Sequence, residues 1–569
     1  MAEFPANDGT ELVLALIASG ELAQAGVILD SLIRRDPGHA ILHFLRGSVA
    51  LKDGRFDEAV EALALADSLD PTTAMFRDVL EEARLTYAKR LVRDDAAAAR
   101  AQIDAANAER PDGIFAVLRA ATWLEAIPTS RAAMQTGRNA YEAAVQGLAD
   151  LVAPIDPSRI LRAGPHFYAA YQGVDARPCQ QAVADFYRRN CPALSYRAPH
   201  VDAAPGAIRT IGFVSAYLSN HSIGKLYRGI IQRLDRRRFR VVTLSFGRHD
   251  DVYGRAIAAE SDAHVILPRG LAEAQAAIAA ERLDILFYPE IGMDPLTYFL
   301  AFARLARVQV MGWGHPMTSG ISSIDAFISS TDLEEAGQGA EAHYVERLIR
   351  LSLPPTYLYA PEASAPGDAP DLSFAHGRTI YCCPQLLFKI HPDFDAILFA
   401  ILERDPNGVL VFIEAEPGGA KRLCARWQLD QRGLAERVVF LPRLTHAAYL
   451  ALLAAVPVVL DTIHFSGGIS TVETLAQGTP VVTWPTTFMC GRVSYAYYRA
   501  MGLDDCIAQD AEDYVARAVR LGTDEAWRAE VRARIRNAVP RLFKRADMLR
   551  EFEDALIAAG GDRDPREPE

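Results

Sequence analysis

From Ile208 onward, short apolar runs alternate with stretches of helical periodicity. The runs occupy residues 211–214, 241–246, 265–267, 285–288, 308–311, 326–328 and 348–351, and after a turn-rich segment they resume at 379–383, 409–413, 438–441, 456–460 and 481–484. Strands that alternate with helices build parallel sheets with helices on both faces. The pattern therefore predicts two consecutive Rossmann-like α/β domains, at residues 206–360 and 377–559, with helices closing the second domain.

The first part of the chain repeats itself. The run Gly20-Glu-Leu-Ala-Gln-Ala25 recurs 34 residues later as Gly54-Arg-Phe-Asp-Glu-Ala59, and Asp36-Pro37 recurs as Asp70-Pro71. This spacing is the period of the tetratricopeptide repeat (TPR), a pair of helices. We expect the small residues Gly20, Ala25, Gly54, Ala59 and Ala64 where paired helices approach closely. Residues 1–111 are predicted as TPR-like repeats that form a groove for a protein or peptide; a helical cap or a dimerisation element is the alternative.

The remaining segments have no chemistry of their own in the sequence. Residues 112–205 are predicted as a helical connector, with Pro192, Pro199 and Pro205 near its end. Residues 361–376 have the composition of a linker. The last residues, 560–569, are charged and rich in Pro and Gly, as expected of a flexible tail.

Composition narrows the class of protein. The 569 residues include 60 Lys and Arg against 72 Asp and Glu, a net charge of −12. This balance argues against a nucleic-acid binder, which usually has a basic excess. We expect no membrane span, because no apolar stretch approaches about 20 residues. The 7 scattered cysteines and the lack of a signal peptide favour a cytoplasmic protein with reduced thiols. No cluster of metal ligands and no Asp-x-Asp motif is evident, so neither a metal nor a cofactor is expected.

The segment from Leu460 to Pro480 offers the clearest candidate site. An apolar run ends at Asp461, a loop with Gly467 and Gly468 follows, and a helical pattern then runs through Thr471 to Ala476. A helix N-terminus after a Gly-rich turn binds anions, because its unpaired N–H groups point at the ligand. Glu473, one turn into the helix, could accept hydrogen bonds from a ribose. A nucleoside diphosphate at the carboxyl end of a parallel sheet fits this arrangement; an ordinary βα turn remains the alternative.

Several ordered motifs carry a resemblance. They are Ile211-Gly-Phe-Val-Ser215 with Ser219-Asn-His221, Asp284 to Glu290, Val308 to Gly320 with its Gly-His-Pro turn, Cys383 to Pro392, and the Gly-rich segment. In these motifs the chain resembles the O-linked N-acetylglucosamine transferase and SPINDLY family (glycosyltransferase family 41), in particular its bacterial TPR-containing members. Soluble bacterial N-glucosyltransferases share a similar Gly-His-Pro turn. The resemblance covers residues 208 to about 545. It implies the GT-B architecture, two Rossmann-like domains facing a cleft, after an all-α TPR-like domain.

The resemblance also implies roles for residues around the Gly-rich segment. Lys389 corresponds to a lysine that contacts the diphosphate, where its charge would stabilise the leaving group. Gln385 stands four residues before it, where the family's diphosphate-binding glutamine stands three before. Tyr449 takes the place of a histidine that stacks on uracil, a task that an aromatic ring can perform; a core or surface tyrosine without this role is the alternative.

The Gly-rich segment itself departs from the animal-type pattern. Gly468 and Ile469 replace a histidine and a threonine, Ser470 replaces a second threonine, and Glu473 replaces the ribose-binding aspartate. Diphosphate contacts would then come from Ser470 and from backbone N–H groups of residues 467–470. These changes leave both the base and the sugar of the donor open.

Acceptor-side candidates follow strands of the first Rossmann-like domain. His221 suits proton transfer or a hydrogen bond to a hydroxyl because its ordinary pKa lies near neutrality; a histidine that only orients its loop is the alternative. His315 and Thr318 of the Gly-His-Pro turn, together with Glu290, are expected near the sugar or the acceptor. A purely structural turn is the alternative for His315 and Thr318.

The resemblance implies a protein glycosyltransferase. It would move GlcNAc or a hexose from a UDP-sugar to Ser or Thr of a protein recruited by the repeats, with inversion and without a metal. Three alternatives stay open. They are a flagellin glycosyltransferase that uses a CMP-nonulosonic acid, a non-catalytic TPR adaptor with a nucleotide-binding GT-B module, and an isomerase like the UDP-GlcNAc 2-epimerases. The repeats could also pair two chains into a homodimer.

Overall fold

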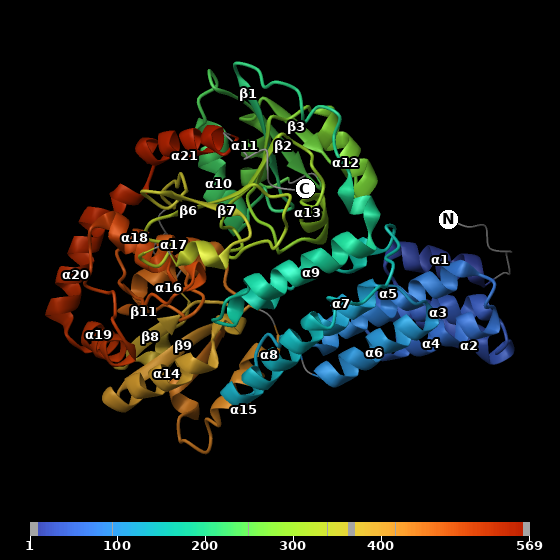
Figure 1. Ribbon diagram of the computed structural model, residues 1–569. Coiled ribbons are helices and arrows are strands. Elements are labelled where there is room, and N and C mark those ends of the chain that lie inside the picture. Colours follow the sequence, from blue (N-terminus) through green and yellow to red (C-terminus); the bar gives the residue numbers. More distant parts are fainter. Residues whose placement is uncertain are drawn as a thin grey trace. The chain divides into compact units, whose positions relative to one another are not determined.

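The computed structural model describes residues 9–93, 95–247, 250–337, 339–361, 370–415 and 417–560. The chain divides into two compact units, Met1–Glu125 and Ala126–Glu569 (Figure 1). Residues 362–369 of the predicted linker and, apart from Gly560, the predicted tail lie outside the described residues.

The first unit consists of helices. They are α1 Thr10–Ser19, α2 Leu22–Arg35, α3 Ala40–Lys52, α4 Phe56–Leu69, α5 Ala74–Leu91, α6 Ala96–Glu109 and α7 Ile114–Ala121. Each helix packs on the next one along the chain. Their shared core includes Val13, Leu29, Val49, Leu63 and Phe76, all at most 1% exposed. Residues 112–125, which the sequence assigns to the connector, belong to this unit.

The 34-residue offset appears in the backbone. The helices α2 and α4 begin at Leu22 and Phe56, and each ends at an aspartate, Asp36 or Asp70, of nearly the same conformation. The alanines of the repeat, Ala25 and Ala59, are fully buried, as expected for close helix packing.

The two repeat glycines have a different role from the one expected. Gly20 and Gly54 have φ angles of +83° and +76°, and an added Cβ at either would meet nothing within 4 Å. They make the left-handed turn that ends α1 and α3, a conformation that favours glycine. The glycine of close approach is instead Gly47, where a Cβ would lie 2.6 Å from Leu63 Cγ.

The second unit begins with α8 Arg131–Gln146 and α9 Arg177–Asn190. A parallel sheet of strand order β3-β2-β1-β4-β5-β6-β7 follows. Its strands are β1 Arg209–Val214, β2 Phe239–Ser245, β3 Ala263–Ile266, β4 Ile285–Tyr288, β5 Val308–Met311, β6 Ala326–Ser330 and β7 Arg347–Leu351. Between them lie α10 Ser222–Arg233, α11 Val252–Ala259, α12 Leu271–Ala280 and α13 Pro295–Leu300.

A second parallel sheet has the order β10-β9-β8-β11-β12. Its strands are β8 Thr379–Cys383, β9 Gly408–Glu414, β10 Val438–Pro442, β11 Val458–Leu460 and β12 Val481–Val482. Its helices are α14 Pro392–Arg404, α15 Gly419–Trp427, α16 His446–Ala455 and α17 Ile469–Ala476. The sheet positions predicted from the apolar runs are thus confirmed in both domains.

Burial explains why the runs could be recognised. The inner strands β4, β5 and β6 are buried at every residue, as parallel strands covered on both faces require. The edge strand β3 alternates between half-buried and exposed residues and gave the weakest run.

The strand orders locate the places where a ligand can bind. In the first sheet the order reverses direction between β1 and β4, and in the second sheet between β8 and β11. Chain connections leave such a point in opposite directions and open a crevice at the carboxyl ends of the strands. The loops after β1, β4, β8 and β11 hold most of the candidate residues of the sequence.

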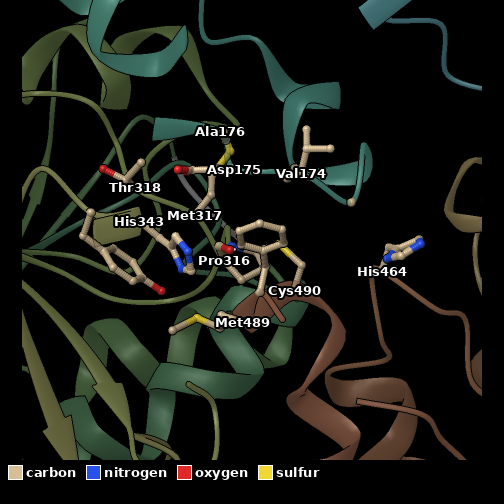
Figure 2. Close-up of a pocket in the computed structure, with 14 residues that line it drawn as sticks. Val174, Asp175, Ala176, Pro316, Met317, Thr318, His343, His464, Met489 and Cys490 are labelled. Carbon is tan, nitrogen blue, oxygen red and sulfur yellow. Dashed lines mark hydrogen bonds between the residues drawn. The ribbon is translucent and has the colours of Figure 1, made fainter. Parts of the chain in front are cut away.

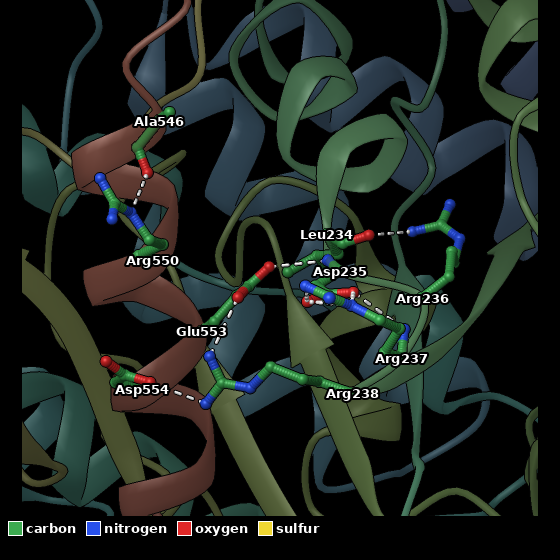
Figure 3. Close-up of polar contacts among 9 residues, drawn as sticks. All are labelled: Leu234, Asp235, Arg236, Arg237, Arg238, Ala546, Arg550, Glu553 and Asp554. Carbon is green, nitrogen blue, oxygen red and sulfur yellow. Dashed lines mark hydrogen bonds and ion pairs between the residues drawn. The ribbon is translucent and has the colours of Figure 1, made fainter.

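The C-terminal helices join the two Rossmann-like domains. They are α18 Val493–Met501, α19 Ala511–Thr523, α20 Glu525–Ala538 and α21 Ala546–Ala558. The α19 helix packs on the second sheet, whereas α21 returns to β7 of the first. Glu553 of α21 accepts from Arg238 at 3.0 Å and from the backbone N–H of Asp235 at 2.7 Å (Figure 3).

Candidate functional site

The carboxyl edge of the second sheet carries a row of linked polar side chains. Gln385 lies in the loop after β8, and Lys389 ends a short 3-10 helix at Leu387–Lys389. Lys389 Nζ donates to Gln385 Oε1 at 3.0 Å, and Gln385 Nε2 donates to Ser470 Oγ at 2.9 Å. Ser470 belongs to the first turn of α17, after β11. The four-residue spacing of Gln385 and Lys389 therefore still places both side chains where the strand order reverses, between β8 and β11.

Lys389 is a poorly solvated cation. Burial lowers its pKa to about 8, although the Asp461 carboxylate acts in the opposite direction. Its Nζ lies 4.7 Å from the centroid of the Phe465 ring, a cation–π contact. Within the described part of the chain it forms no ion pair, so its charge is available to an anionic ligand.

Asp461, which directly follows β11, holds the Gly-rich loop in place. Its two carboxylate oxygens accept from the Gly467 N–H and from the Thr483 hydroxyl, each at 2.8 Å. Burial nevertheless raises its pKa to about 6. The aspartate that ends β11 thus fixes the Gly-rich loop.

The glycines bring the chain close to the row of polar groups. A Cβ at Gly467 would lie 2.6 Å from Gln385 Nε2 and 2.8 Å from Ser470 Oγ. Gly468 is the N-cap of α17 and has no side-chain hydrogen bond there. Helix geometry leaves the first N–H groups, those of Ile469 and Ser470 included, without an intrahelical acceptor and with partial positive charge. The side chain of Ile469 is buried, so only its backbone can serve a ligand.

Glu473 lies one turn after Ser470 and is already paired. Its Oε1 accepts from Lys225 Nζ at 2.8 Å and from His446 Nε2 at 2.8 Å. Burial raises the pKa of Glu473, but the hydrogen bond from His446 and the charge of Lys225 lower it more, and the net shift is downward. Tyr449, one turn after His446, is half-buried, and burial followed by the charge of Glu473 raises its pKa well above the ordinary value.

His221 begins α10 and caps it. Its Nδ1 accepts from the backbone N–H of Ile223 at 3.2 Å, and its ring stacks on Tyr217 at 4.5 Å. Burial, and then the charge of Lys225, lower the pKa of His221. A neutral imidazole whose Nδ1 accepts carries its proton on Nε2. The free nitrogen is thus a hydrogen-bond donor, and this geometry favours donation to an oxygen over proton abstraction.

Glu290 lies near the beginning of the loop after β4 and is fully buried. Its Oε1 lies 3.4 Å from Ser215 Oγ, while Oε2 has no hydrogen-bond partner. Burial raises the pKa of this carboxyl well above its ordinary value. Glu290 is therefore a buried carboxyl of raised pKa within the first domain.

The Gly-His-Pro turn after β5 is packed into protein. His315 is 1% exposed and its Nε2 has no partner, and burial lowers its pKa to about 4. Its ring stacks on Phe167 of the connector at 5.2 Å. Thr318 donates to Glu346 at 2.6 Å and accepts from the Gly320 N–H at 3.2 Å. The Thr318 hydroxyl thus stabilises the turn itself.

An open pocket of about 450 Å³ lies beside this turn. Figure 2 shows Met317 and Thr318 with His343, and opposite them His464 and Cys490 of the second domain. The connector supplies a further wall at residues 173–176. Its Tyr171 stacks on Phe465 at 4.2 Å, next to Lys389. Residues 126–205 therefore shape the region between the two domains.

Among the described residues, the structure brings together one group of possible metal ligands that the sequence did not indicate. Ligand atoms of His391, Asp393 and His464 lie within 4.8 Å of one another. His464 Nε2 lies 3.1 Å from Asp393 Oδ2, and the His391 Nδ1 accepts from the Asp393 N–H at 3.1 Å. Arg131 Nε stands 2.9 Å from the other Asp393 oxygen. The Asp393 carboxylate thus faces the Arg131 guanidinium and the His464 ring, and the guanidinium charge disfavours a metal cation beside it.

Comparison with known proteins gives two matches to family models. Residues 372–545 match glycosyl transferase family 41, and residues 16–82 match the tetratricopeptide repeat. The solved structure of a Thermobaculum terrenum O-GlcNAc transferase mutant covers 98% of this chain, with 98% of its own length matched, a TM-score of 0.65 and 23% identity.

This chain is similar to the O-GlcNAc transferase and SPINDLY family of TPR-containing glycosyltransferases, with a family 41 match at residues 372–545 and a repeat match at residues 16–82. The family match at residues 372–545 contains the whole row from Gln385 to Glu473. The likeness to the Thermobaculum terrenum structure supports the GT-B fold. The resemblance and the fold class inferred from the sequence are confirmed.

Three relatives show how far the sequence similarity extends. A probable SPINDLY UDP-N-acetylglucosamine–peptide N-acetylglucosaminyltransferase of Solanum lycopersicum is 29% identical over 238 residues, 41% of this chain and 25% of that protein. The corresponding transferase of Caenorhabditis elegans is 29% identical over 31% of this chain and 16% of its own length. A UDP-glucose:protein N-β-glucosyltransferase of Actinobacillus pleuropneumoniae is 26% identical over 44% of this chain and 40% of its own length. The chain thus matches well under half of each relative.

The sequence did not single out two residues of this candidate site. Lys225 and His446 both contact Glu473. Lys225 stands four residues after His221, one helical turn along the same face, and that spacing could have indicated it.

Among the described helices, none is long and apolar enough to cross a membrane.

Proposed function

We propose that this chain is a protein glycosyltransferase that takes a sugar from a nucleoside diphosphate donor. The observation that carries the proposal is the chain of hydrogen bonds from Lys389 through Gln385 to Ser470, at the N-terminus of α17. It joins a cation, an amide and a helix N-terminus at a crossover point of a parallel sheet, a combination suited to a diphosphate. The family 41 match at residues 372–545 supports the same reading.

The site's own groups suit departure of a nucleoside diphosphate. Negative charge develops on the leaving phosphate as the bond to the sugar breaks, and preorganised donors stabilise it. Lys389 and the first N–H groups of α17 supply such donors on the second domain. The family resemblance suggests inversion at the anomeric carbon and transfer without a metal. His221, with its proton on Nε2, would donate a hydrogen bond to a phosphate, sugar or acceptor oxygen.

The acceptor is a protein side chain, Ser or Thr in the first instance. The repeat unit exposes apolar side chains at Leu12, Val27, Leu65 and Leu69, each at least 40% accessible. Exposed apolar groups on a helical repeat are suited to binding a protein segment. The relatives' names favour UDP-GlcNAc as donor and UDP-glucose next, and the Actinobacillus enzyme makes Asn the second acceptor to test.

A second candidate has an observation in its favour. Gly468 and Ile469 offer no side-chain donor to the ligand, since the Ile469 side chain is buried. A site that binds its anion mainly through Lys389 and backbone groups is less selective for the sugar of the donor. A flagellin glycosyltransferase that uses a CMP-nonulosonic acid is compatible with this lower selectivity.

The test is a transfer assay on the full chain. Labelled UDP-GlcNAc, UDP-glucose and a CMP-nonulosonic acid are each incubated with the protein and with lysate or purified flagellin, and labelled protein is identified by mass spectrometry. Label on Ser or Thr from a UDP-sugar supports the leading proposal, and label from the CMP donor alone supports the second. Nucleotide binding without transfer would favour an adaptor, and donor turnover without a protein acceptor an epimerase-like isomerase.

A further inference from the structure

The first turns of two helices face each other across the domains. The α10 helix, which follows the first strand of the first sheet, contacts α17 of the second domain. Lys225 lies in the first turn of α10, where its N–H donates to the His221 carbonyl at 3.0 Å. Its side chain crosses to Glu473, with Nζ 2.8 Å from Oε1. The Lys225 and Glu473 side chains are only 18% and 8% exposed, so this ion pair is largely withdrawn from water.

The partners of Glu473 leave donors of Lys225 unused. Glu473 is ionised, because the net shift of its pKa is downward, and a carboxylate only accepts hydrogen bonds. His446 Nε2, 2.8 Å from the same oxygen, must therefore carry a proton. The 3.4 Å contact between Lys225 Nζ and His446 Nε2 then places two donors side by side. In the described residues, Glu473 is the one oxygen acceptor of Lys225, whereas an ammonium has three N–H donors.

Lys225 also completes the row on α17. Ser470 and Glu473 are three residues apart, so they are neighbours on one face of the helix. Lys389 reaches Ser470 through Gln385, and Lys225 reaches Glu473. Two ammonium groups, one from each domain, thus stand at opposite ends of the same helical turn. Both helix N-termini add partial positive charge to the space between them.

We infer that Lys225 is a second phosphate-binding residue of the donor site, delivered by the first domain and oriented by Glu473. The inference rests on the proposed function and goes beyond it. A diphosphate held by Lys389 at one end gains a charge-assisted hydrogen bond from Lys225 at the other. Because Lys225 belongs to the opposite domain, the phosphates are then held by both Rossmann-like domains.

The experiment compares ligands that differ only in their number of phosphate groups. Affinities of uridine, UMP and UDP are measured by calorimetry on the full chain for wild type, Lys225→Met and Lys225→Arg; cytidine, CMP and CDP are used if the protein selects cytosine. Lys225→Met keeps the length of the side chain and removes the charge. Lys421→Ala, an exposed lysine on α15, is the control. Thermal melting of each variant without ligand checks that it is folded.

The expected result is a selective loss. Lys225→Met weakens UDP by at least about tenfold and uridine by less than about twofold, and Lys225→Arg restores most of the UDP affinity, because a charge-assisted hydrogen bond contributes of that order. Equal weakening of uridine and UDP would overturn the inference, since Lys225 would then act only through Glu473 and the ribose. Unchanged UDP affinity in folded Lys225→Met would also overturn it. Failure of the proposed function looks different, because wild type itself would bind none of the nucleotides.

Discussion

The two Rossmann-like domains treat the polar side chains at their carboxyl edges differently. In the second domain Lys389, Gln385 and Ser470 are linked to one another and end at a helix N-terminus without a side-chain cap. In the first domain Glu290 and His315 are buried with one polar atom each left unpaired, and Thr318 stabilises its own turn. Glu290 and His315 at the first edge are thus packed inside the protein, whereas Lys389 at the second edge has a charge that a ligand can pair with.

This difference separates two tasks. A diphosphate has fixed chemistry, so its donors can be arranged before it binds. On the proposed function, a protein acceptor brings its own shape, and the pocket beside the Gly-His-Pro turn is lined largely by apolar and aromatic groups, among them Met317 and Phe488. We therefore expect substitutions in the second domain to change binding and turnover, and most substitutions in the first to change stability.

The largest effect is expected from Lys389→Ala. Loss of a preorganised donor to a leaving group typically lowers kcat by about 10²–10³. The hydrogen bond from Gln385 to Ser470 does not involve Lys389, so we expect it to remain in the variant and the fold to stay intact. Steady-state transfer rates measure the effect, with Lys421→Ala as the control. A loss of less than about threefold would place the phosphate elsewhere.

The pH dependence of nucleotide affinity is the next largest effect. Burial lowers the pKa of Lys389 to about 8, so the free protein loses this positive charge as the pH rises through that value. UDP binding, which needs the ammonium form, is expected to weaken about tenfold between pH 7.5 and pH 9. Lys389→Arg keeps its charge at both pH values and should flatten the profile. Calorimetric titrations measure both profiles, and equal slopes in the two proteins would contradict the assignment.

Substitutions of His221 in the first domain are expected to have a smaller effect on turnover. Removal of an N-cap costs about 1 kcal/mol, and Asn is a good N-cap residue. His221→Ala should speed hydrogen exchange in the first turn of α10, whereas His221→Asn should not. Because Nδ1 is occupied by the Ile223 N–H, we expect turnover of His221→Asn to stay within about tenfold of wild type. A loss of 10²–10⁴ would instead be typical of a general base.

Glu290→Gln is expected to have the smallest effect. Burial raises the pKa of Glu290, so at a pH below the ordinary carboxyl pKa the variant exchanges one neutral group for another of similar shape in both the folded and the unfolded state. There the free energy of unfolding should change by less than about 1 kcal/mol. A raised carboxyl pKa gives stability below the unfolded pKa that is lost as the pH rises through the folded pKa. Wild type should therefore melt relatively earlier toward alkaline pH than Glu290→Gln. A variant that is less stable at every pH would show that Glu290 is charged.

Much of this architecture was predictable from local pattern. Buried parallel strands are continuous apolar runs, and residues 285–288, 308–311 and 379–383 coincide with β4, β5 and β8. The repeat spacing is likewise a local signal, although it did not distinguish the left-handed turns at Gly20 and Gly54 from close packing.

Contacts between distant segments could not be predicted in this way. The pairing of Lys225 with Glu473 joins residues 248 positions apart, and nothing near either residue specifies the other. The connector gave no signal, because Tyr171 acquires its role only by stacking on Phe465. Motif spacing indicated Lys389 and Ser470, but their link through Gln385 depends on how the loops after β8 and β11 fold together.

The most direct test of the account is whether a nucleotide stabilises the protein through Lys389. UDP, CMP, GDP and their sugars are added in a thermal melting experiment to wild type and Lys389→Ala. Ligand at about a hundredfold over Kd should stabilise wild type by about 2.7 kcal/mol. The account predicts a shift with UDP, or with CMP if the second donor class is correct, that is lost in the variant. Stabilisation of both proteins alike, or of neither by any nucleotide, would contradict a phosphate site at this edge of the second sheet.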